Sequence, residues 1–268
     1  MTPAGQKSVD HGGGPPSPAG RILITLAGLL VFVTLLVLGG WQVQRLGWKL
    51  DLIARVDARV HAVPGPPPSA TEWPHIADYE YRRLRLTGSF LNDRETLVQA
   101  VTEIGPGFWV LTPLQMADGT TILVNRGFVP PERRDPASRV AGLVDSLTTV
   151  TGLLRLSEPD GGFLRSNDPA EGRWYSRDVA AIARTENLAE AAPYFVDADA
   201  TANPGGWPVG GLTVIAFRNH HLVYAVTWFA LAAMLAGVGI WAWRKRRRPA
   251  ADAVAAARDA SATGRASA

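Results

Sequence analysis

The sequence predicts a membrane protein in which two transmembrane α-helices, one N-terminal and one C-terminal, flank one β-rich α+β extracytoplasmic domain. Two apolar runs, 22–38 and 222–243, carry no charged side chain and are separated by about 180 residues. At a rise of 1.5 Å per residue, about 20 such residues span the roughly 30 Å hydrocarbon core of a bilayer. Several stretches between the runs alternate apolar and polar side chains, as half-buried strands do.

The N-terminal part is predicted to be a tail followed by a membrane anchor. Residues 1–20 are rich in Gly, Pro and Ser and cannot bury a core, which predicts a disordered cytoplasmic tail. Residues 21–40 form the first predicted transmembrane helix. A cleaved signal peptide is the alternative, but the apolar run is longer than a usual signal-peptide core and no Ala-x-Ala cleavage site follows it. We therefore expect an uncleaved anchor.

The helical spacing continues beyond Trp41 until prolines begin at position 64. Residues 41–62 are therefore predicted as a helical extension and residues 63–75 as a proline-rich linker. Trp41 and Trp48 suit the lipid headgroup layer, where an indole keeps its N–H hydrated. Three basic side chains of the extension could contact lipid phosphates or a partner: Arg45, Lys49 and Arg55.

The extracytoplasmic domain is predicted over residues 41–220 and is rich in strands. Apolar and β-branched stretches, several of them alternating with polar residues, predict five strands, at 79–90, 96–101, 108–115, 120–128 and 148–156. Asp118-Gly119 predicts a hairpin turn between the third and fourth strands, because Asp-Gly readily adopts the positive φ angles of such a turn. Within the domain one helix is expected, over residues 176–189.

The C-terminal part sets the expected orientation. Residues 221–243 are the second predicted transmembrane helix, and residues 244–268 are a basic, Ala-rich cytoplasmic tail expected to be disordered after the basic run 244–248. That run should stay on the cytoplasmic side, as should Lys7 and Arg21, so that both termini are cytoplasmic. The first 20 residues contain one Lys and no Arg, unlike a mitochondrial presequence. We therefore expect a bacterial cell (plasma) membrane.

Composition and motifs exclude several function classes. The chain has no cysteine, so it has no disulfide, no thiolate metal site and no covalent haem attachment through Cys-x-x-Cys-His. Much of its basic excess lies at the membrane edge in the run 244–248, which favours membrane orientation over nucleic-acid binding. The Gly-Pro-Gly at 105–107 lacks the lysine and helix of a phosphate loop, and neither Gly-x-Ser-x-Gly nor His-Glu-x-x-His is present. No enzymatic activity is expected.

His221 is the candidate site residue because it lies at the outer end of the second predicted membrane helix. His221, Tyr224 and Trp228 follow at i, i+3 and i+7, on one helix face. An ionisable side chain at the membrane edge is costly without a task or a partner, and a neutral imidazole can ligate haem iron in a cleft between two helices. The alternative is a histidine that anchors the helix end through hydrogen bonds.

Other polar residues receive surface or structural interpretations. Asp93 and Glu95 lie among turn-like residues and are expected to be solvated, as are His61 and His75. Arg126 could bind a propionate or another carboxylate, or it could form a structural salt bridge.

Four stretches recur together in a known family. They are Gly-Gly-Trp-Gln-Val-Gln-Arg-Leu-Gly-Trp-Lys (39–49), Thr-Ile-Leu-Val-Asn-Arg-Gly-Phe-Val-Pro (121–130), Asn-Asp-Pro followed by Trp-Tyr-Ser-Arg-Asp (167–178), and Arg-Asn-His-His-Leu-Val-Tyr-Ala-Val-Thr-Trp (218–228). In this order, between two membrane spans, they resemble the surfeit locus protein 1 family of cytochrome c oxidase assembly factors, over roughly residues 39–243. The chain departs from the family at His220, where Asn or Glu is usual, and at Gly172, where Asn is frequent.

The resemblance implies a two-span inner-membrane protein that helps to mature the catalytic subunit of the oxidase. For some bacterial members it implies haem a binding, and the proposed iron ligand of the family falls on His221, with Tyr224 and Trp228 as walls of the haem site and His220 as the alternative ligand. Cytochrome c oxidase subunit I, haem a synthase and membrane lipid are then the expected partners, with no nucleic acid. The alternative function is a haem-independent membrane scaffold that stabilises oxidase assembly intermediates. An extracellular sensor is a third reading, and the cytoplasmic tails carry no output module that supports it.

Overall fold

The computed structural model describes residues 17–162, 164–213, 215, 217 and 219–263, with side chains up to residue 247. The chain forms two compact units, residues 1–51 with 218–268 and residues 52–217, which we describe separately. Of the tail predicted over residues 1–20, residues 1–16 lie outside the described residues. The first helix begins at Pro18, within the last residues of that predicted tail.

Two long helices build the first unit: α1 (Pro18–Val60), whose last turns belong to the second unit, and α3 (His221–Thr263). Both are long and apolar enough to cross a membrane, over Pro18–Val60 and His221–Arg247. Only 6% and 11% of their most apolar windows are buried, so most of these apolar side chains face outward, as they would toward lipid. The predicted fold class, two apolar helices flanking a β-rich domain, is confirmed.

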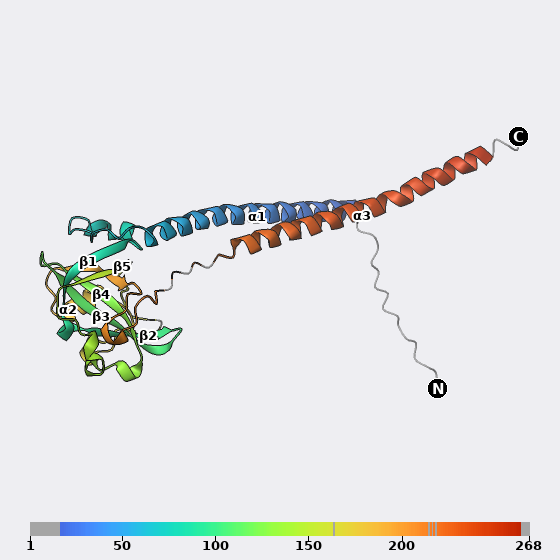
Figure 1. Cartoon of the computed structure of the whole chain (residues 1–268). Helices are drawn as coiled ribbons and strands as arrows, with labels where there is room; N and C mark the ends of the chain where they lie inside the picture. Colours follow the sequence, from blue (N-terminus) through green and yellow to red (C-terminus); the bar gives the residue numbers. More distant parts are fainter. Residues whose placement is uncertain (1–16, 163, 214, 216, 218, 264–268) are drawn as a thin grey trace, which may run out of the picture. The chain divides into compact units, whose positions relative to one another are not determined.

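The two helices pack side by side as an antiparallel hairpin (Figure 1). Shielded positions of α1 recur at steps of four and three: Gly28, Phe32, Leu35, Gly39, Gln42 and Leu46. Shielded positions of α3 recur in the same way: His221, Ala225, Trp228, Ala232 and Leu235. A repeat of 3.5 residues keeps one face of each helix toward its neighbour, as in left-handed coiled coils. We call the contact between these two rows of side chains the hairpin seam.

The structure corrects the prediction for the C-terminal tail. α3 continues through the basic run 244–248 to Thr263, whereas disorder was expected after that run. The physical reason is composition, because this stretch is rich in alanine, the residue with the highest helix propensity. Residues 264–268 lie outside the described residues.

Six strands form the framework of the second unit (Figure 1). They are β1 (Arg83–Phe90), β2 (Thr96–Thr102), β3 (Gly105–Met116), β4 (Thr121–Val129), β5 (Thr148–Leu156) and β6 (Ala191–Ala198). The sheet order is β1-β5-β6-β4-β3-β2, and β1 also pairs with β3, so β1, β5, β6, β4 and β3 close into a barrel. β4 and β6 are parallel, and the other strand pairs are antiparallel.

The local predictions within the domain are mostly confirmed. The first five strands match the predicted stretches within a few residues, and the Asp118-Gly119 hairpin turn is present, with φ of 88° at Gly119. The N–H of Gly119 donates to the carbonyl of Met116 (3.1 Å). The predicted helix 176–189 is wrong in length, because α2 spans only Val179–Thr185. The sequence does not predict β6, which opens with Ala-Ala-Pro, residues of low strand propensity.

Side chains that point into the barrel form the main core, because successive residues of a strand face opposite sides. Its most buried members are Leu84, Leu86, Leu114, Ile122, Val124, Leu154, Tyr194 and Val196. A 3₁₀ helix, Trp73–Tyr79, packs Trp73 and Tyr79 against this core, although Trp73 lies in the predicted linker. A second core lies between α2 and the outer side of the sheet, where Ile182 of α2 packs with Leu123 and Phe195.

Candidate functional site

His221 is the first residue of α3 and is half-buried in the hairpin seam. Its Nδ1 lies 2.8 Å from Oε1 of Gln42 on α1. Gln42 is only 9% exposed, so the amide and the imidazole meet where water is largely excluded. Because an amide oxygen can only accept, the imidazole donates from Nδ1, and in the neutral ring this tautomer places the lone pair on Nε2.

This contact has the form found around metal-ligating histidines. Such a histidine commonly donates its second ring N–H to an oxygen, which fixes the tautomer and the orientation of the ring. Within the described part of the chain, no group of three or more His, Cys, Asp or Glu side chains is placed to hold a metal ion. A single imidazole suits an iron that brings its own four equatorial nitrogens, as haem iron does.

The structure brings some of the sequence-predicted site residues together. Trp228 lies in the hairpin seam, two turns along α3 from His221, and is half-buried. Tyr224 is 54% exposed and lies at the edge of the face that they share. His220 precedes the helix and is exposed, and its carbonyl accepts the N–H of Tyr224 (3.2 Å). His221 and Trp228 therefore share the seam, Tyr224 flanks it, and His220 is open to the surroundings.

A glycine sets the helix spacing one turn from the Gln42–His221 contact. A Cβ on Gly39 would lie 2.7 Å from Cε1 of Phe229, so the Phe229 ring packs directly on the backbone of α1. At the next residue, Gly40, nothing lies within 4 Å of the Cβ position. Gly39 therefore permits the close approach of the helices beside the candidate site.

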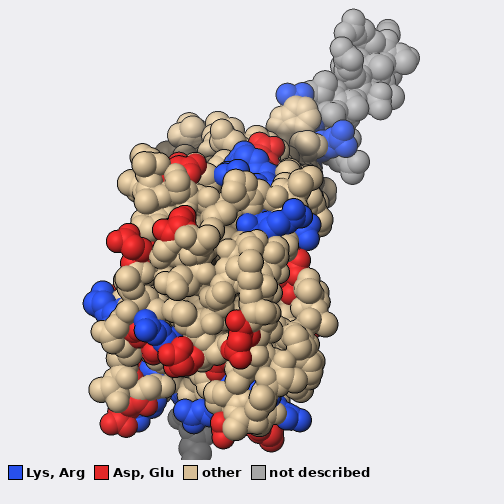
Figure 2. All heavy atoms as spheres, turned by 60° about the vertical axis from the view of Figure 1, so that its left-hand side comes forward, with Lys and Arg blue, Asp and Glu red and all other residues tan. Residues whose placement is uncertain are grey.

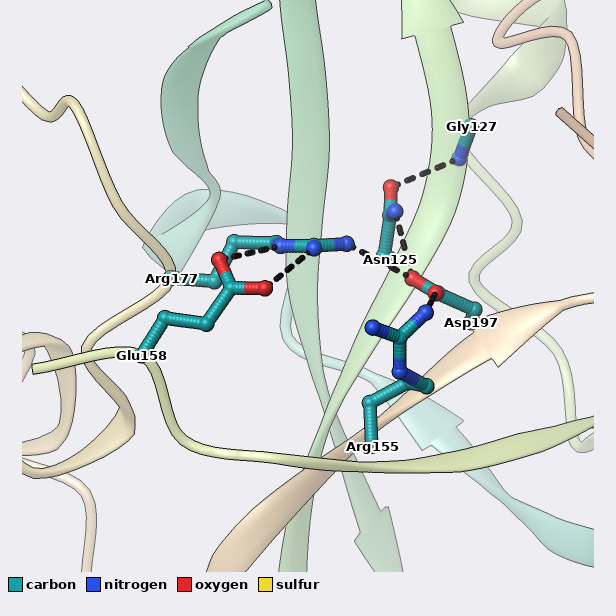
Figure 3. A network of polar contacts seen from close by, with 6 residues as sticks. All are labelled: Asn125, Gly127, Arg155, Glu158, Arg177 and Asp197. Atoms are coloured by element: carbon teal, nitrogen blue, oxygen red, sulfur yellow. Dashed lines mark hydrogen bonds and ion pairs between the residues drawn. The ribbon is translucent and has the colours of Figure 1, made fainter. Parts of the chain in front are cut away.

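The domain holds a second concentration of polar groups, shown in Figure 3. Asp197 on β6 is 2% exposed and accepts hydrogen bonds from Asn125 (2.7 Å), Arg177 (3.2 Å) and Arg155 (3.3 Å). Arg177 also forms an ion pair with Glu158. Burial alone would lower the pKa of Arg177, but the hydrogen bond to Glu158 and the nearby carboxylates raise it above its usual value.

This network ties three strands to the segment before α2. Asn125, Arg155 and Asp197 stand on β4, β5 and β6, and Arg177 immediately precedes the α2 N-cap. A cavity of about 640 Å³ lies beside them, walled in part by the apolar side chain of Trp109. Because the two guanidinium groups and the two carboxylates balance one another, the network needs no further ion, and we assign it a structural role.

Several predicted surface residues were tested by the structure. Asp93, His61 and His75 are exposed, as expected. The prediction of a solvated Glu95 is wrong, because its side chain is only 4% exposed and forms an ion pair with buried Arg139. That partner lies 44 residues away and could not be recognised locally. On the domain face in Figure 2, acidic and basic side chains are interspersed and do not gather into a patch of one sign.

Arg126 also departs from expectation. It is 2% exposed, and no ion pair between described residues includes it, so the expected structural salt bridge is absent from that part of the chain. Its Nη2 donates to the carbonyl of Gly142 and to Oδ1 of Asn203 (3.2 Å).

Sequence reasoning missed Gln42 as part of the candidate site. The signal was present in the repeat of the hairpin seam, where Gln42 follows Gly39 by three residues and precedes Leu46 by four. An amide in a row that is otherwise apolar needs a partner, because a buried polar group without a hydrogen bond is costly. The partner itself, 179 positions away, follows only from the hairpin.

Comparison with known proteins gives a consistent set of matches. Residues 29–233 match the model of the SURF1 family. The chain is 37% identical over 222 residues to Surfeit locus protein 1 of Homo sapiens, covering 76% of this chain and 72% of that protein. It is 37% identical over 223 residues to a SURF1-like protein of Monosiga brevicollis (78% and 83% covered) and 28% identical over 268 residues to one of Caenorhabditis elegans (91% and 82% covered).

Proposed function

The chain belongs to the SURF1 family of membrane proteins, known as cytochrome oxidase assembly factors, and on this premise we propose that it binds haem a and helps to deliver it to subunit I of cytochrome c oxidase. Members of the family are generally non-enzymatic, and carriage of a haem requires no chemical step. The observation that supports the proposal is the 2.8 Å contact between Nδ1 of His221 and Oε1 of Gln42, which leaves Nε2 of His221 free to ligate iron.

Each residue of the candidate site has a defined task in this proposal. His221 ligates the haem iron through Nε2, and Gln42 holds the imidazole in the required tautomer and orientation. Trp228 and Tyr224 offer aromatic surface to the macrocycle from the same helix face. His220 is exposed beside the site and is the alternative ligand.

The cellular setting belongs to the same proposal. The basic run 244–248 keeps the end of the second span in the cytoplasm, so both termini are cytoplasmic and the domain lies outside a bacterial plasma membrane. Haem a synthase supplies the haem, and subunit I receives it as that subunit folds. A single protein ligand suits such transfer, because a carrier that binds too tightly cannot release its cargo.

The test is the visible absorption spectrum of the full chain purified from membranes that also make haem a. The parent is expected to carry haem, and His221→Ala is expected to lose it or to shift its spectrum. His220→Ala is the matched control and should leave the spectrum unchanged. Gln42→Leu should weaken haem binding by roughly 10- to 100-fold, as expected when the hydrogen-bond partner of a metal-ligating histidine is removed, and Gln42→Glu should restore it because a carboxylate also accepts from Nδ1.

Two outcomes would overturn parts of this proposal. Equal haem in the parent and in His221→Ala would exclude His221 as the ligand and redirect the search to His220. A folded parent without haem, in membranes shown to contain haem a, would favour the haem-independent scaffold that stabilises oxidase assembly intermediates.

A further inference from the structure

Arg126 occupies a position where a small barrel normally places an apolar side chain. It continues the row of β4 residues that begins with Ile122 and Val124, both of which face the barrel core. Its guanidinium lies over the ring of Phe90, another core residue, at 4.6 Å from the ring centre. A positive charge therefore closes one end of the barrel interior.

The hydrogen bonds of this guanidinium are incomplete. Among the residues that the structure describes, only Nη2 has acceptors, the Gly142 carbonyl and the Asn203 side chain, whereas Nε and Nη1 are buried and have no hydrogen-bond partner there. Three of the five N–H groups of an arginine are carried by those two nitrogens. Burial, opposed by the charge of Glu95 and aided by that of Arg139, lowers the pKa of Arg126 to about 10, so the group is still charged at neutral pH.

Neighbouring carboxylates do not neutralise this charge. Glu95, whose charge acts on Arg126, is already paired with Arg139. Among the ion pairs between described residues, none includes Arg126. A buried charge that has neither a counter-ion nor a full set of hydrogen bonds is costly, so each such case calls for a missing partner.

A cavity of about 230 Å³ adjoins Arg126 at this end of the barrel. Liquid water occupies roughly 30 Å³ per molecule, so the cavity has room for a small organic molecule. The polar residues that line it are Arg126, Asn203, Asp199 and four threonines, Thr148, Thr149, Thr151 and Thr201. Its apolar walls include Phe90, Val144, Val150 and Ala198. Barrel mouths of this mixed character are common ligand sites.

We propose that this barrel mouth is a binding site for a short-chain monocarboxylate, with Arg126 as its counter-ion. Arg126 supplies the neutralising charge, and Thr148, which shares the inward face of β5 with Val150, supplies a hydroxyl donor. The aliphatic part of the ligand lies against the apolar walls. The site belongs to the domain and does not depend on haem.

Charge favours a monocarboxylate over phosphate. One carboxylate neutralises one guanidinium, whereas a phosphate would carry excess negative charge toward Asp199, which also lines the cavity. The carboxylate of Asp199 is held by the N–H and hydroxyl of Thr201 and lies 3.5 Å from Arg83. It is therefore engaged elsewhere and does not serve Arg126.

The experiment uses the full chain in nanodiscs, free of haem, titrated with butyrate at constant ionic strength. Binding is followed by saturation-transfer NMR and by the rise in the thermal unfolding midpoint that a ligand of the native state produces. We expect saturation at roughly 0.1–10 mM, the range for a ligand of a few heavy atoms with one ion pair. Butyramide, which has the same shape without the charge, and inorganic phosphate are the matched comparisons, and neither should saturate in this range.

Three variants locate the site. Arg126→Gln should abolish butyrate binding, and Arg85→Gln, which removes an exposed arginine, should leave it unchanged. Because Arg126→Gln could fail to fold, Ala202→Phe provides a second route: Ala202 is exposed and lines the cavity, so the larger side chain should block it without touching the core. The proposal is overturned if butyrate does not bind, if butyramide or phosphate binds equally well, or if Ala202→Phe binds butyrate as the parent does.

Discussion

Gly39 and Gly40 form a matched pair for testing how the helix hairpin is held together. We predict that Gly39→Leu opens the hairpin seam and that Gly40→Leu does not. The two residues are adjacent in α1, but a side chain at Gly39 meets the ring of Phe229, whereas one at Gly40 meets open space. The substitutions change hydrophobicity and helix propensity equally, so a difference between them reports packing.

The expected magnitude follows from the distances at Gly39. A Cβ there would lie 2.7, 2.8 and 3.0 Å from three atoms of the Phe229 ring, whereas carbon atoms in contact prefer about 3.5–4.0 Å. Overpacking of this kind costs about 1–3 kcal/mol. Phe229 is 41% exposed and can move aside in part, so we expect about 2 kcal/mol, or roughly 30-fold in the equilibrium for closing the hairpin.

The assay exploits the absence of cysteine from the chain. Cysteines introduced at Leu36 and Val226, which are 40% and 61% exposed, carry nitroxide labels without disturbing the seam. Pulsed electron paramagnetic resonance then gives the distance between the two labels, and so between the helices. Gly39→Leu should lengthen and broaden the distance distribution, while Gly40→Leu should match the parent. Unfolding in mixed micelles of rising dodecyl sulfate content then gives the free-energy difference.

Identical distance distributions and unfolding midpoints for the two variants would refute this account of the seam. A loss of packing should also be felt one turn away, at the contact between Gln42 and His221. We therefore expect Gly39→Leu, but not Gly40→Leu, to weaken the binding of the ligand that His221 holds.

Three further predictions concern the domain. Asp197→Ala should lower the free energy of unfolding by about 3–5 kcal/mol in chemical denaturation, because it leaves two guanidinium groups without their shared buried counter-ion. Leu154→Ala, at 0% exposure, should cost about 2–5 kcal/mol, whereas Leu147→Ala, at 71% exposure, should stay within about 0.5 kcal/mol in the same measurement. Glu72 has its pKa lowered from 4.5 to about 2, chiefly by the hydrogen bond from the Tyr79 hydroxyl, so the unfolded chain takes up a proton at higher pH than the folded chain. Its stabilising contribution is thus complete above pH 4.5 and is lost as the pH falls toward 2. Glu72→Gln should therefore flatten the plot of unfolding free energy against pH in this range. An unchanged plot would contradict the assignment of this pH dependence to Glu72.

The parts of the fold that the sequence predicts are those controlled by local pattern. The two spans follow from uncharged apolar runs, five strands follow from local strand patterns, and the turn at Asp118-Gly119 follows from backbone preference. β6 lacks such a local signal at its start, and its parallel pairing with β4 depends on a connection of more than sixty residues. The closure of the barrel through β1 and β3 is likewise a long-range event that no local pattern encodes.

The residues of the candidate site divide in the same way, into those that the local sequence indicates and those that only long-range contacts bring together. His221 could be found because a histidine at the end of an apolar helix is conspicuous on its own. Gln42 could not be assigned, because its meaning depends on the register between helices from opposite ends of the chain. Glu95 was misjudged for a related reason: its surroundings in sequence are polar, and only the fold brings Arg139 over it.

The Gln42–His221 hydrogen bond also specifies alignment. Elsewhere the hairpin seam is built from small and apolar side chains, and such a surface can be satisfied by more than one sliding position of the helices. A slide by one helical turn, about 5.4 Å, would leave an amide and an imidazole without partners, and each orphaned group would cost about 1–3 kcal/mol. The pair therefore favours one axial register of α1 against α3 and disfavours the registers that are shifted by one helical turn.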